Sequence, residues 1–98
     1  MSLRVTFRRA ARAEFEKDAD YYEQQRVGLG REFMREIDET VQRAVSHPER
    51  FAVVAGGVQR IAARRFPYTV FYRVRGAKIE VLAVFHGSRN PLIWQRRI

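Results

Sequence analysis

His86 and Arg89, three residues apart near the C-terminus, are residue types that suit a site acting on a phosphate. A histidine can transfer protons near neutral pH, and an arginine can hold a phosphate through two parallel hydrogen bonds. A histidine at a strand end can equally be packed or hydrogen-bonded locally, and an arginine can be solvated or paired with a carboxylate. The residue types therefore leave acid–base chemistry and simple binding both open.

Other common catalytic chemistries find few suitable residues in this sequence. The chain has no cysteine, which excludes disulfides, thiolate nucleophiles and cysteine-based metal sites. The second histidine, His47, lies far from His86 in sequence, and no metal-ligand spacing connects the two. The sequence also has no Gly-x-Ser-x-Gly elbow and no glycine-rich phosphate loop. We expect neither a metal nor a cofactor.

The basic residues are concentrated in the second half of the chain. The net charge is +8, and residues 1–50 contribute nothing to it, because ten Lys or Arg balance ten Asp or Glu. Residues 51–98 hold nine Lys or Arg against a single acid, Glu80. This imbalance predicts a dedicated basic face and an anionic partner: nucleic acid, a membrane surface or an acidic protein.

Aromatic residues alternate with the arginines of this basic half. Such a mixture suits phosphate contacts combined with base stacking, but it is also typical of protein–protein hot spots. The composition does not separate RNA binding from protein binding. The residues that we predict to contact a partner are Arg60, Arg65, Tyr68, Arg73, Arg89, Trp94 and Arg96.

The first half of the chain has the pattern of a strand followed by two helices. Residues 3–7 alternate apolar and polar side chains, as in a half-buried strand. Apolar residues then recur at spacings of three and four from residue 8 or 9 to 25, and again over residues 29–45. Glycines at the break between these patterns and Pro48 after the second predict the helix ends. A helical hairpin is predicted.

β-branched and aromatic residues dominate the second half. Residues 58–64, 69–75 and 79–85 are predicted as strands, and a glycine-bearing turn at 76–78 joins the last two as an antiparallel hairpin. The order β-α-α-β-β-β predicts an α+β fold, with the helical hairpin packed on one face of a small, mainly antiparallel sheet. A chain of 98 residues supplies one core, so we expect a single domain over residues 1–98.

Strand alternation predicts which residues share the face away from the helices. If Ile79 and every second residue after it face the helices, Lys78, Glu80 and His86 lie on the opposite face. Arg73 joins them there by the same argument. A one-residue bulge would reverse these assignments. The expected result is one apolar face under the helices and one basic face open to a partner.

The sequence also bears on where the protein works. It contains no run of about 18 or more apolar residues, which a membrane-spanning helix requires. Residues 1–5 lead directly into the strand pattern rather than into a signal segment. We expect a cytoplasmic protein without a membrane span.

Several short segments carry a family resemblance, and they follow one another along nearly the whole chain. They are Tyr22-Glu23-Gln24-Gln25, Gly28-Leu29-Gly30 with Phe33, Pro48-Glu49-Arg50-Phe51, Arg60, Arg65-Phe66-Pro67-Tyr68, Phe71-Tyr72-Arg73-Val74, Val84-Phe85-His86, and Arg89-Asn90-Pro91 with Trp94. No single segment is specific. In this order, they resemble the RelE/ParE family of toxins from bacterial type II toxin–antitoxin pairs, and more closely its ParE branch.

The resemblance implies one of two activities. ParE-type members inhibit DNA gyrase by binding it, whereas RelE-type members cut mRNA in the ribosome by phosphoryl transfer from a 2′-hydroxyl. In RelE-like sequences an arginine follows the tyrosine that begins the third strand, and this chain has Thr69 there. Because that arginine would stabilise phosphate charge, its absence favours a ParE-like toxin that is not an enzyme. If the chain is RelE-like instead, the candidate catalytic residues are His86, Arg60, Arg65 and Arg89.

The resemblance also implies a protein partner. Toxins of this kind inhibit growth, stabilise plasmids or chromosomes, and are neutralised by a cognate antitoxin, here a ParD-like protein that is often acidic. Such an antitoxin can dock a helix in a groove or add a strand to the sheet, and the basic half would complement its acidic residues. A third hypothesis is a nucleic-acid-binding module without toxicity.

Overall fold

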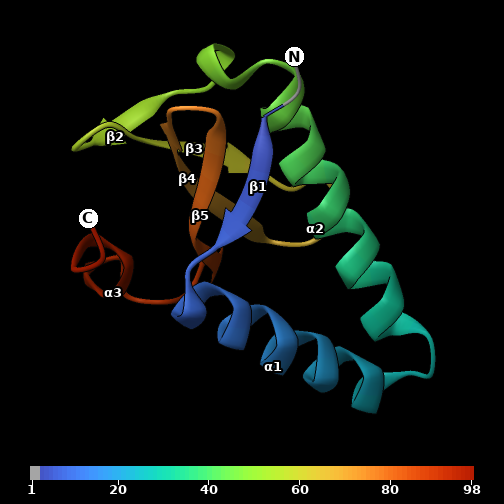
Figure 1. Cartoon of the computed structure of the whole chain (residues 1–98). Helices are drawn as coiled ribbons and strands as arrows, with labels where there is room; N and C mark the ends of the chain where they lie inside the picture. The colour runs from blue at the N-terminus through green and yellow to red at the C-terminus, as the bar shows by residue number, and fades with distance from the viewer. Residues whose placement is uncertain (1–2) are drawn as a thin grey trace.

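The computed structural model describes residues 3–98 of the chain and is drawn in Figure 1. In chain order, the elements are β1 (Arg4–Phe7), α1 (Arg9–Gln25), α2 (Leu29–Ser46), the 3₁₀ helix η1 (Pro48–Arg50), β2 (Val53–Ala55), β3 (Val58–Ala62), β4 (Tyr68–Arg75), β5 (Lys78–His86) and α3 (Leu92–Gln95). The predicted β-α-α-β-β-β order is confirmed, and the short elements β2 and α3 are additions that the sequence pattern did not predict.

The strands form one sheet in the order β1-β5-β4-β3-β2. β1 pairs in parallel with β5, and the other neighbouring pairs are antiparallel, so the sheet is mainly antiparallel, as predicted. In Figure 1, α1 and α2 lie along one side of the sheet and α3 lies on the other. We call the side under α1 and α2 the helix face and the opposite side the open face.

Apolar stripes from both helices fill the helix face. In α2, Phe33, Ile37 and Val41 recur every four residues, and each is at most 3% exposed. The Phe33 ring lies at the centre, 5.1 Å from the ring of Tyr22 on α1 and 4.8 Å from the ring of Tyr68 on β4. Charged residues occupy the outer sides of both helices, and no helix within residues 3–98 is long and apolar enough to cross a membrane.

The turn between α1 and α2 is fixed by one carboxylate and two glycines. Glu23 accepts hydrogen bonds from the backbone N–H groups of Gly28 and Gly30, at 2.9 and 3.0 Å, and so satisfies donors at the start of α2. Gly28 has a φ of +90°, which favours glycine. A Cβ at Gly30 would lie 2.5 Å from the carbonyl oxygen of Ala19, so the close contact between the helices requires glycine there.

A buried carboxylate joins α2 to the loop between β3 and β4. Glu36 is 7% exposed, and its Oε2 accepts the backbone N–H groups of Arg64 and Arg65, at 2.6 and 3.1 Å. Burial by itself raises the pKa of Glu36, but these two hydrogen bonds and the charges of Arg65 and Arg43 outweigh it. The pKa therefore lies below its ordinary value, and the side chain holds the loop as a carboxylate.

Candidate functional site

A bulge in β5 decides which way the last residues of that strand point. Tyr72 of β4 lies opposite Val81, but its neighbour Phe71 lies opposite Ala83, so Leu82 is an extra residue in β5. The alternation of side chains reverses after this point. The prediction that Ala83 continues the helix-facing series was therefore wrong, because Ala83 packs on the open face with Phe71.

The reversal places His86 on the helix face. Its register partner is Tyr68, and the two rings meet edge to face with their centres 5.2 Å apart. Val84 lies on the same face and Phe85 on the other. The prediction that His86 lies on the open, basic face was wrong, and the bulge is the reason.

The local contacts of His86 determine the tautomer of its neutral ring. Its Nδ1 accepts the backbone N–H of Ser88 at 3.0 Å, and the Ser88 hydroxyl lies 2.7 Å from the same nitrogen. Because Nδ1 acts as an acceptor, the neutral imidazole carries its proton on Nε2. This is the packed, locally hydrogen-bonded histidine that the sequence left open as an alternative.

Tyr68, one of the predicted contact residues, is part of the core. It is 6% exposed and packs in the helix-face cluster. Burial, followed by the nearby Asp18 and Tyr22, raises the pKa of Tyr68 well above its ordinary value. The ring therefore does not offer a stacking surface to a partner in this structure.

Trp94 is also buried, in a second and smaller core on the open face. Its ring stacks on that of Phe71 at 4.1 Å between centres and 17° between planes, and Trp94 is 4% exposed. Val58, Leu82 and Phe85 complete this cluster with Ala83. The segment that carries α3 thus covers part of the sheet, and Trp94 holds it there rather than presenting a ring to a partner.

Glu14 of α1 also holds the segment that carries α3, through contacts with two arginines of that segment. Arg97 donates two hydrogen bonds to the Glu14 carboxylate, at 2.9 and 2.7 Å, and one to the carbonyl oxygen of Leu82 at 3.0 Å. Arg89 lies 3.4 Å from the same carboxylate, with its guanidinium 4.8 Å from the centre of the Phe85 ring. The hydrogen bonds to Glu14 raise the pKa of Arg97, and both arginines are occupied in holding the chain end.

The four candidate catalytic residues do not gather at one point. His86 and Arg89 both line a small hollow beside Trp94 at the end of β5, although the His86 ring packs against Tyr68 of the helix face. Arg60 lines a different hollow, together with Arg43 and Phe51. Arg65 lies 3.0 Å from Glu32 of α2 and is engaged in an ion pair.

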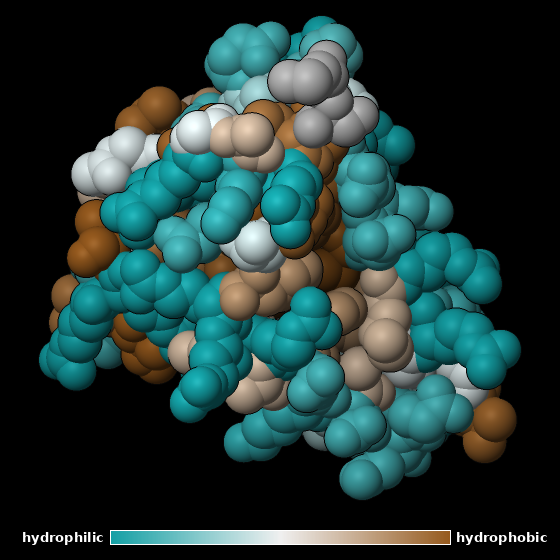
Figure 2. Space-filling view, viewed as in Figure 1, coloured by the Kyte–Doolittle hydropathy of each residue, from teal (hydrophilic) through white to brown (hydrophobic). Residues whose placement is uncertain are grey.

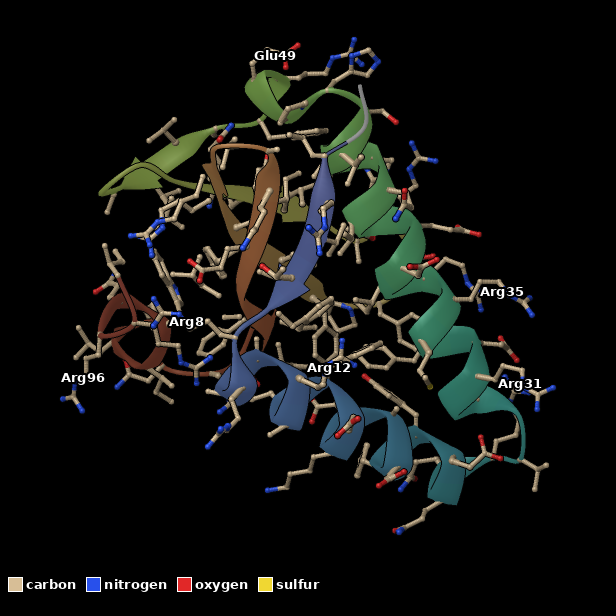
Figure 3. The ribbon with its side chains drawn as sticks, viewed as in Figure 1. Arg8, Arg12, Arg31, Arg35, Glu49 and Arg96 are labelled. Carbon is tan, nitrogen blue, oxygen red and sulfur yellow. The ribbon has the colours of Figure 1, made fainter. Side chains whose placement is uncertain are left out.

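Ion pairs within the fold neutralise part of the basic half. Four of its nine cations pair with carboxylates, and two of the three carboxylates come from residues 1–50. The pairs are Arg65 with Glu32, Arg73 with Glu80, and Arg89 and Arg97 with Glu14. The cations of this half without a carboxylate within 4.0 Å, among the residues that the structure describes, are Arg60, Arg64, Arg75, Lys78 and Arg96. Figure 3 shows Arg96 projecting outwards from α3.

Three exposed cations line up across the open face at one end of the sheet. Lys78 of β5 is the register partner of both Arg4 on β1 and Arg75 on β4. Register partners point to the same side of a sheet, so the three side chains form one row on adjacent strands. All three are exposed, and we call them the cationic row.

The next row of the sheet contains the only acid of the basic half. Glu80 accepts a hydrogen bond from Arg73 at 3.1 Å and lies 3.7 Å from the Nε of Arg8, which Figure 3 shows on the side of the sheet where α3 lies. Burial raises the pKa of Glu80, but the hydrogen bond and the charges of Arg8, Arg73 and Arg75 outweigh it and leave the pKa lowered. Arg73, a predicted contact residue, is only 12% exposed because it lies against Glu80.

Sequence reasoning missed Arg4 and undervalued Lys78. Arg4 belongs to the charge-balanced first half, and nothing in its own segment marks it as a contact residue. The parallel pairing of β1 with β5 brings it beside Lys78, and that pairing joins the two ends of the chain. The signal was available only in the strand parity of residues 73–80, which correctly placed Lys78 on the open face.

A second candidate surface lies where β1, α1 and α2 meet. A recess of about 280 Å³ is lined by Phe7, Phe15, Met34 and Ile37, with Arg12 and Asp38 also lining it. Figure 2 shows pale-brown and brown side chains between hydrophilic ridges in this region. Met34 is 47% exposed there, so an apolar side chain is accessible at the edge of the recess.

The chain is similar to known proteins along most of its length. It matches the family model described as the ParE toxin of the type II toxin–antitoxin system parDE, over residues 5–91. It is 36% identical over 55 residues to Toxin ParE2 of Mycobacterium tuberculosis, from strains CDC 1551 / Oshkosh and H37Rv. That match takes in 56% of this chain and 52% of the relative, so the chain spans about half the length of the curated relatives it matches.

The fold is similar to that of a solved structure described as the chromosomal ParDE toxin–antitoxin system from P. aeruginosa. The TM-score is 0.72, and the match covers 86% of this chain and 95% of that chain. The sequence identity is 21%, so this likeness concerns the fold alone. The α+β arrangement predicted from the sequence is the one found there.

Proposed function

Because the chain belongs to the ParE toxin family of type II toxin–antitoxin systems, we propose that it inhibits DNA gyrase by binding it and is neutralised by a ParD-like antitoxin. The observation that carries the proposal is the match to the family model, which extends over residues 5–91. Growth inhibition and plasmid or chromosome stabilisation follow from the same proposal.

The arrangement of polar side chains supports binding rather than catalysis. A general base and the groups that hold a phosphate must lie within a few ångströms of the reacting atoms. Here, Arg65 and Arg89 are both engaged with carboxylates, and Arg60 lines a hollow beside that of His86 rather than the same one. A ribosome-dependent endoribonuclease would need these groups to converge.

The direct test is a supercoiling assay with purified gyrase. We expect the protein to inhibit supercoiling or to trap gyrase-cleaved DNA. Since a basic protein can also block an enzyme by coating the DNA, relaxation of the same plasmid by an unrelated topoisomerase is the control, and it should be unaffected. Cleavage of ribosome-bound mRNA with no effect on gyrase would refute the proposal and favour the nuclease.

His86 gives a second test between the two activities. If the protein acts by binding, His86→Ala should arrest growth like the wild type, provided that the variant folds. If the protein is a nuclease with His86 as its acid–base group, the variant should cause no arrest although it folds.

The apolar recess supports the proposal of a ParD-like antitoxin. A groove lined by phenylalanine, methionine and isoleucine side chains suits the apolar side of an amphipathic helix. The arginines around it would complement an acidic segment, since Arg12 lines the recess and Arg31 and Arg35 occupy the outer side of α2 (Figure 3).

The recess can be tested with the product of the adjacent reading frame. Met34→Glu should weaken binding of that protein by roughly tenfold or more, because it places a charge against the apolar side of the docked segment. Val27→Glu is the matched control, since Val27 is 87% exposed and lies in the turn between the helices. Equal binding by both variants would show that the recess is not the binding site.

A further inference from the structure

We propose that the cationic row, Arg4, Lys78 and Arg75, binds the phosphate backbone of duplex DNA. The row lies on three adjacent strands, so the backbone positions of the outer two residues stand about 10 Å apart and the sheet fixes their spacing. A DNA duplex presents a negative charge about every 1.7 Å along its axis, so three rigidly placed cations meet three phosphates without a special fit.

Among residues 3–98, no residue of the row is held in an ion pair, although the charge of Arg75 acts on Glu80 from a longer distance. The one acid in the next row, Glu80, is occupied by Arg73 and Arg8. Cations held apart from their counter-charges on a rigid surface form an anion-binding site.

The surroundings of the row favour a repeating anion over a protein partner. Protein interfaces concentrate their binding energy in a few well-packed anchors at the centre of the contact, most often tryptophan, tyrosine and arginine. Behind the row, the same face offers Thr6, Glu80 and Arg73, which include no aromatic ring, and Arg73 is already hydrogen-bonded to Glu80. Binding therefore depends on charge, and the phosphate backbone supplies it at every nucleotide.

The burial of the aromatic residues favours a duplex over a single strand. Single strands are bound largely by stacking bases on exposed aromatic rings. The aromatic residues of the basic half are buried or half-buried, and they are Phe51, Phe66, Tyr68, Phe71, Tyr72, Phe85 and Trp94. A duplex keeps its bases stacked internally and needs only backbone contacts. The choice of DNA over duplex RNA rests on the proposed function, because gyrase acts on duplex DNA.

The test is a salt titration of binding to a mixed-sequence DNA duplex, followed by fluorescence anisotropy. The triple variant Arg4→Ala, Lys78→Ala, Arg75→Ala should bind roughly ten- to a hundredfold more weakly at low salt. The plot of log K against log salt should become less steep by about 2.7, because each of the three lost phosphate contacts contributes about 0.9 to the slope. Circular dichroism and urea unfolding confirm that the variant folds.

The matched control removes the same charge from the two long helices instead of the sheet. Lys17→Ala, Arg31→Ala, Arg35→Ala takes three exposed cations from α1 and α2, and Figure 3 shows Arg31 and Arg35 pointing away from the sheet. This variant should keep nearly all of the wild-type affinity and slope. If it loses as much as the row variant, binding follows net charge alone and the proposal is wrong.

Other ligands give further outcomes. Tighter binding of single-stranded DNA or duplex RNA than of duplex DNA would overturn the assignment, and so would row-dependent binding of poly-glutamate without binding of DNA. The assay contains no gyrase, so it fails or succeeds separately from the proposed function. Gyrase inhibition without row-dependent DNA binding would refute this proposal alone, and DNA binding without inhibition would refute the proposed function alone.

Discussion

The two faces of the sheet are covered in different ways. On the helix face, α1 and α2 bury a continuous apolar cluster that includes Phe33, Ile37 and Tyr72. On the open face, the segment carrying α3 is the part of residues 3–98 that covers the sheet, through Trp94, which belongs to a cluster of six buried residues. The remaining end of that face is bare and carries the cationic row.

The two faces therefore have different roles, since the helix face mainly stabilises the fold and the open face is available to bind a partner. The helix face carries the main apolar core, with the recess beside Met34 at its edge, so it contributes mainly to folding. The open face has a small core that is held by a chain end and two arginines, and its free part has the charge to bind a partner. Changes on the helix face should therefore affect the whole domain, and changes on the open face should have local effects.

Phe33→Ala should have the largest effect on stability. Phe33 is fully buried and its ring contacts four other aromatic rings, so the variant leaves a large cavity in the main core. We expect a loss of about 4 kcal/mol in the free energy of unfolding. Urea unfolding followed by far-UV circular dichroism measures it. Met34→Ala, one residue further along the same helix but partly exposed, is the control and should cost much less.

Trp94→Ala should act on the open face alone. The variant removes the ring that stacks on Phe71, which we expect to cost about 2–3 kcal/mol, because part of the cavity cost is avoided when the chain end detaches. Trypsin should then cut at Arg89 or Arg96 much faster, while helix content is unchanged. Ile93→Ala, on the same short helix but 37% exposed, is the control. Cooperative loss of the helices together with the chain end would contradict the separation of the two faces.

The elements that the sequence revealed are those with a strong local pattern. The two helices and the strands β1, β3, β4 and β5 have clear periodicity, and their predicted bounds agree with the structure to within a few residues. β2 has three residues, all exposed, and α3 has four, so neither has enough length for a period to appear. Both elements depend on contacts with other parts of the chain, and a local sequence pattern does not reveal such contacts.

The candidate site was harder to predict than the fold because it depends on register. A single extra residue at Leu82 moved His86 to the other face, and nothing in the segment Ile79–Phe85 announces the bulge. Trp94 is buried because its ring stacks on Phe71, an apolar residue of the open face that would otherwise be exposed. Arg4 joined the site through a parallel pairing between residues 74 positions apart.

A pH change tests the carboxylate that supports the helix face, Glu36. This carboxylate is more deeply buried than Glu80 on the open face and Glu14, which holds the chain end there. The pKa of Glu36 is lowered in the folded state, so its contribution to stability is present above its unfolded pKa of about 4.5 and is lost as pH falls through the folded pKa. Glu36→Gln should cost about 1–2 kcal/mol at neutral pH, because two backbone N–H groups lose a charged acceptor.

The unfolding free energies of Glu36→Gln and the wild type should converge as the pH falls below about 4.5, the ordinary pKa of a glutamate. Urea unfolding at several pH values measures this difference. Glu39→Gln is the control, since Glu39 is an exposed residue on the same helix. A difference between Glu36→Gln and the wild type that stays constant as the pH falls would mean that the carboxylate charge does not hold the loop.

Glu80→Gln and Glu14→Gln form a matched pair with the smallest expected effect. Each carboxylate lies between two arginines, and each substitution raises the net charge by one. Glu80 lies in the row behind the cationic row, whereas Glu14 holds the chain end.

If placement decides binding, Glu80→Gln should tighten binding to duplex DNA by roughly two- to fivefold, because Arg73 and Arg8 become free to contact phosphates. Glu14→Gln should leave affinity within about twofold and should instead speed trypsin cleavage of the chain end. Equal tightening by both variants in the same anisotropy assay would mean that the bare end of the open face binds DNA only through the overall charge of the protein.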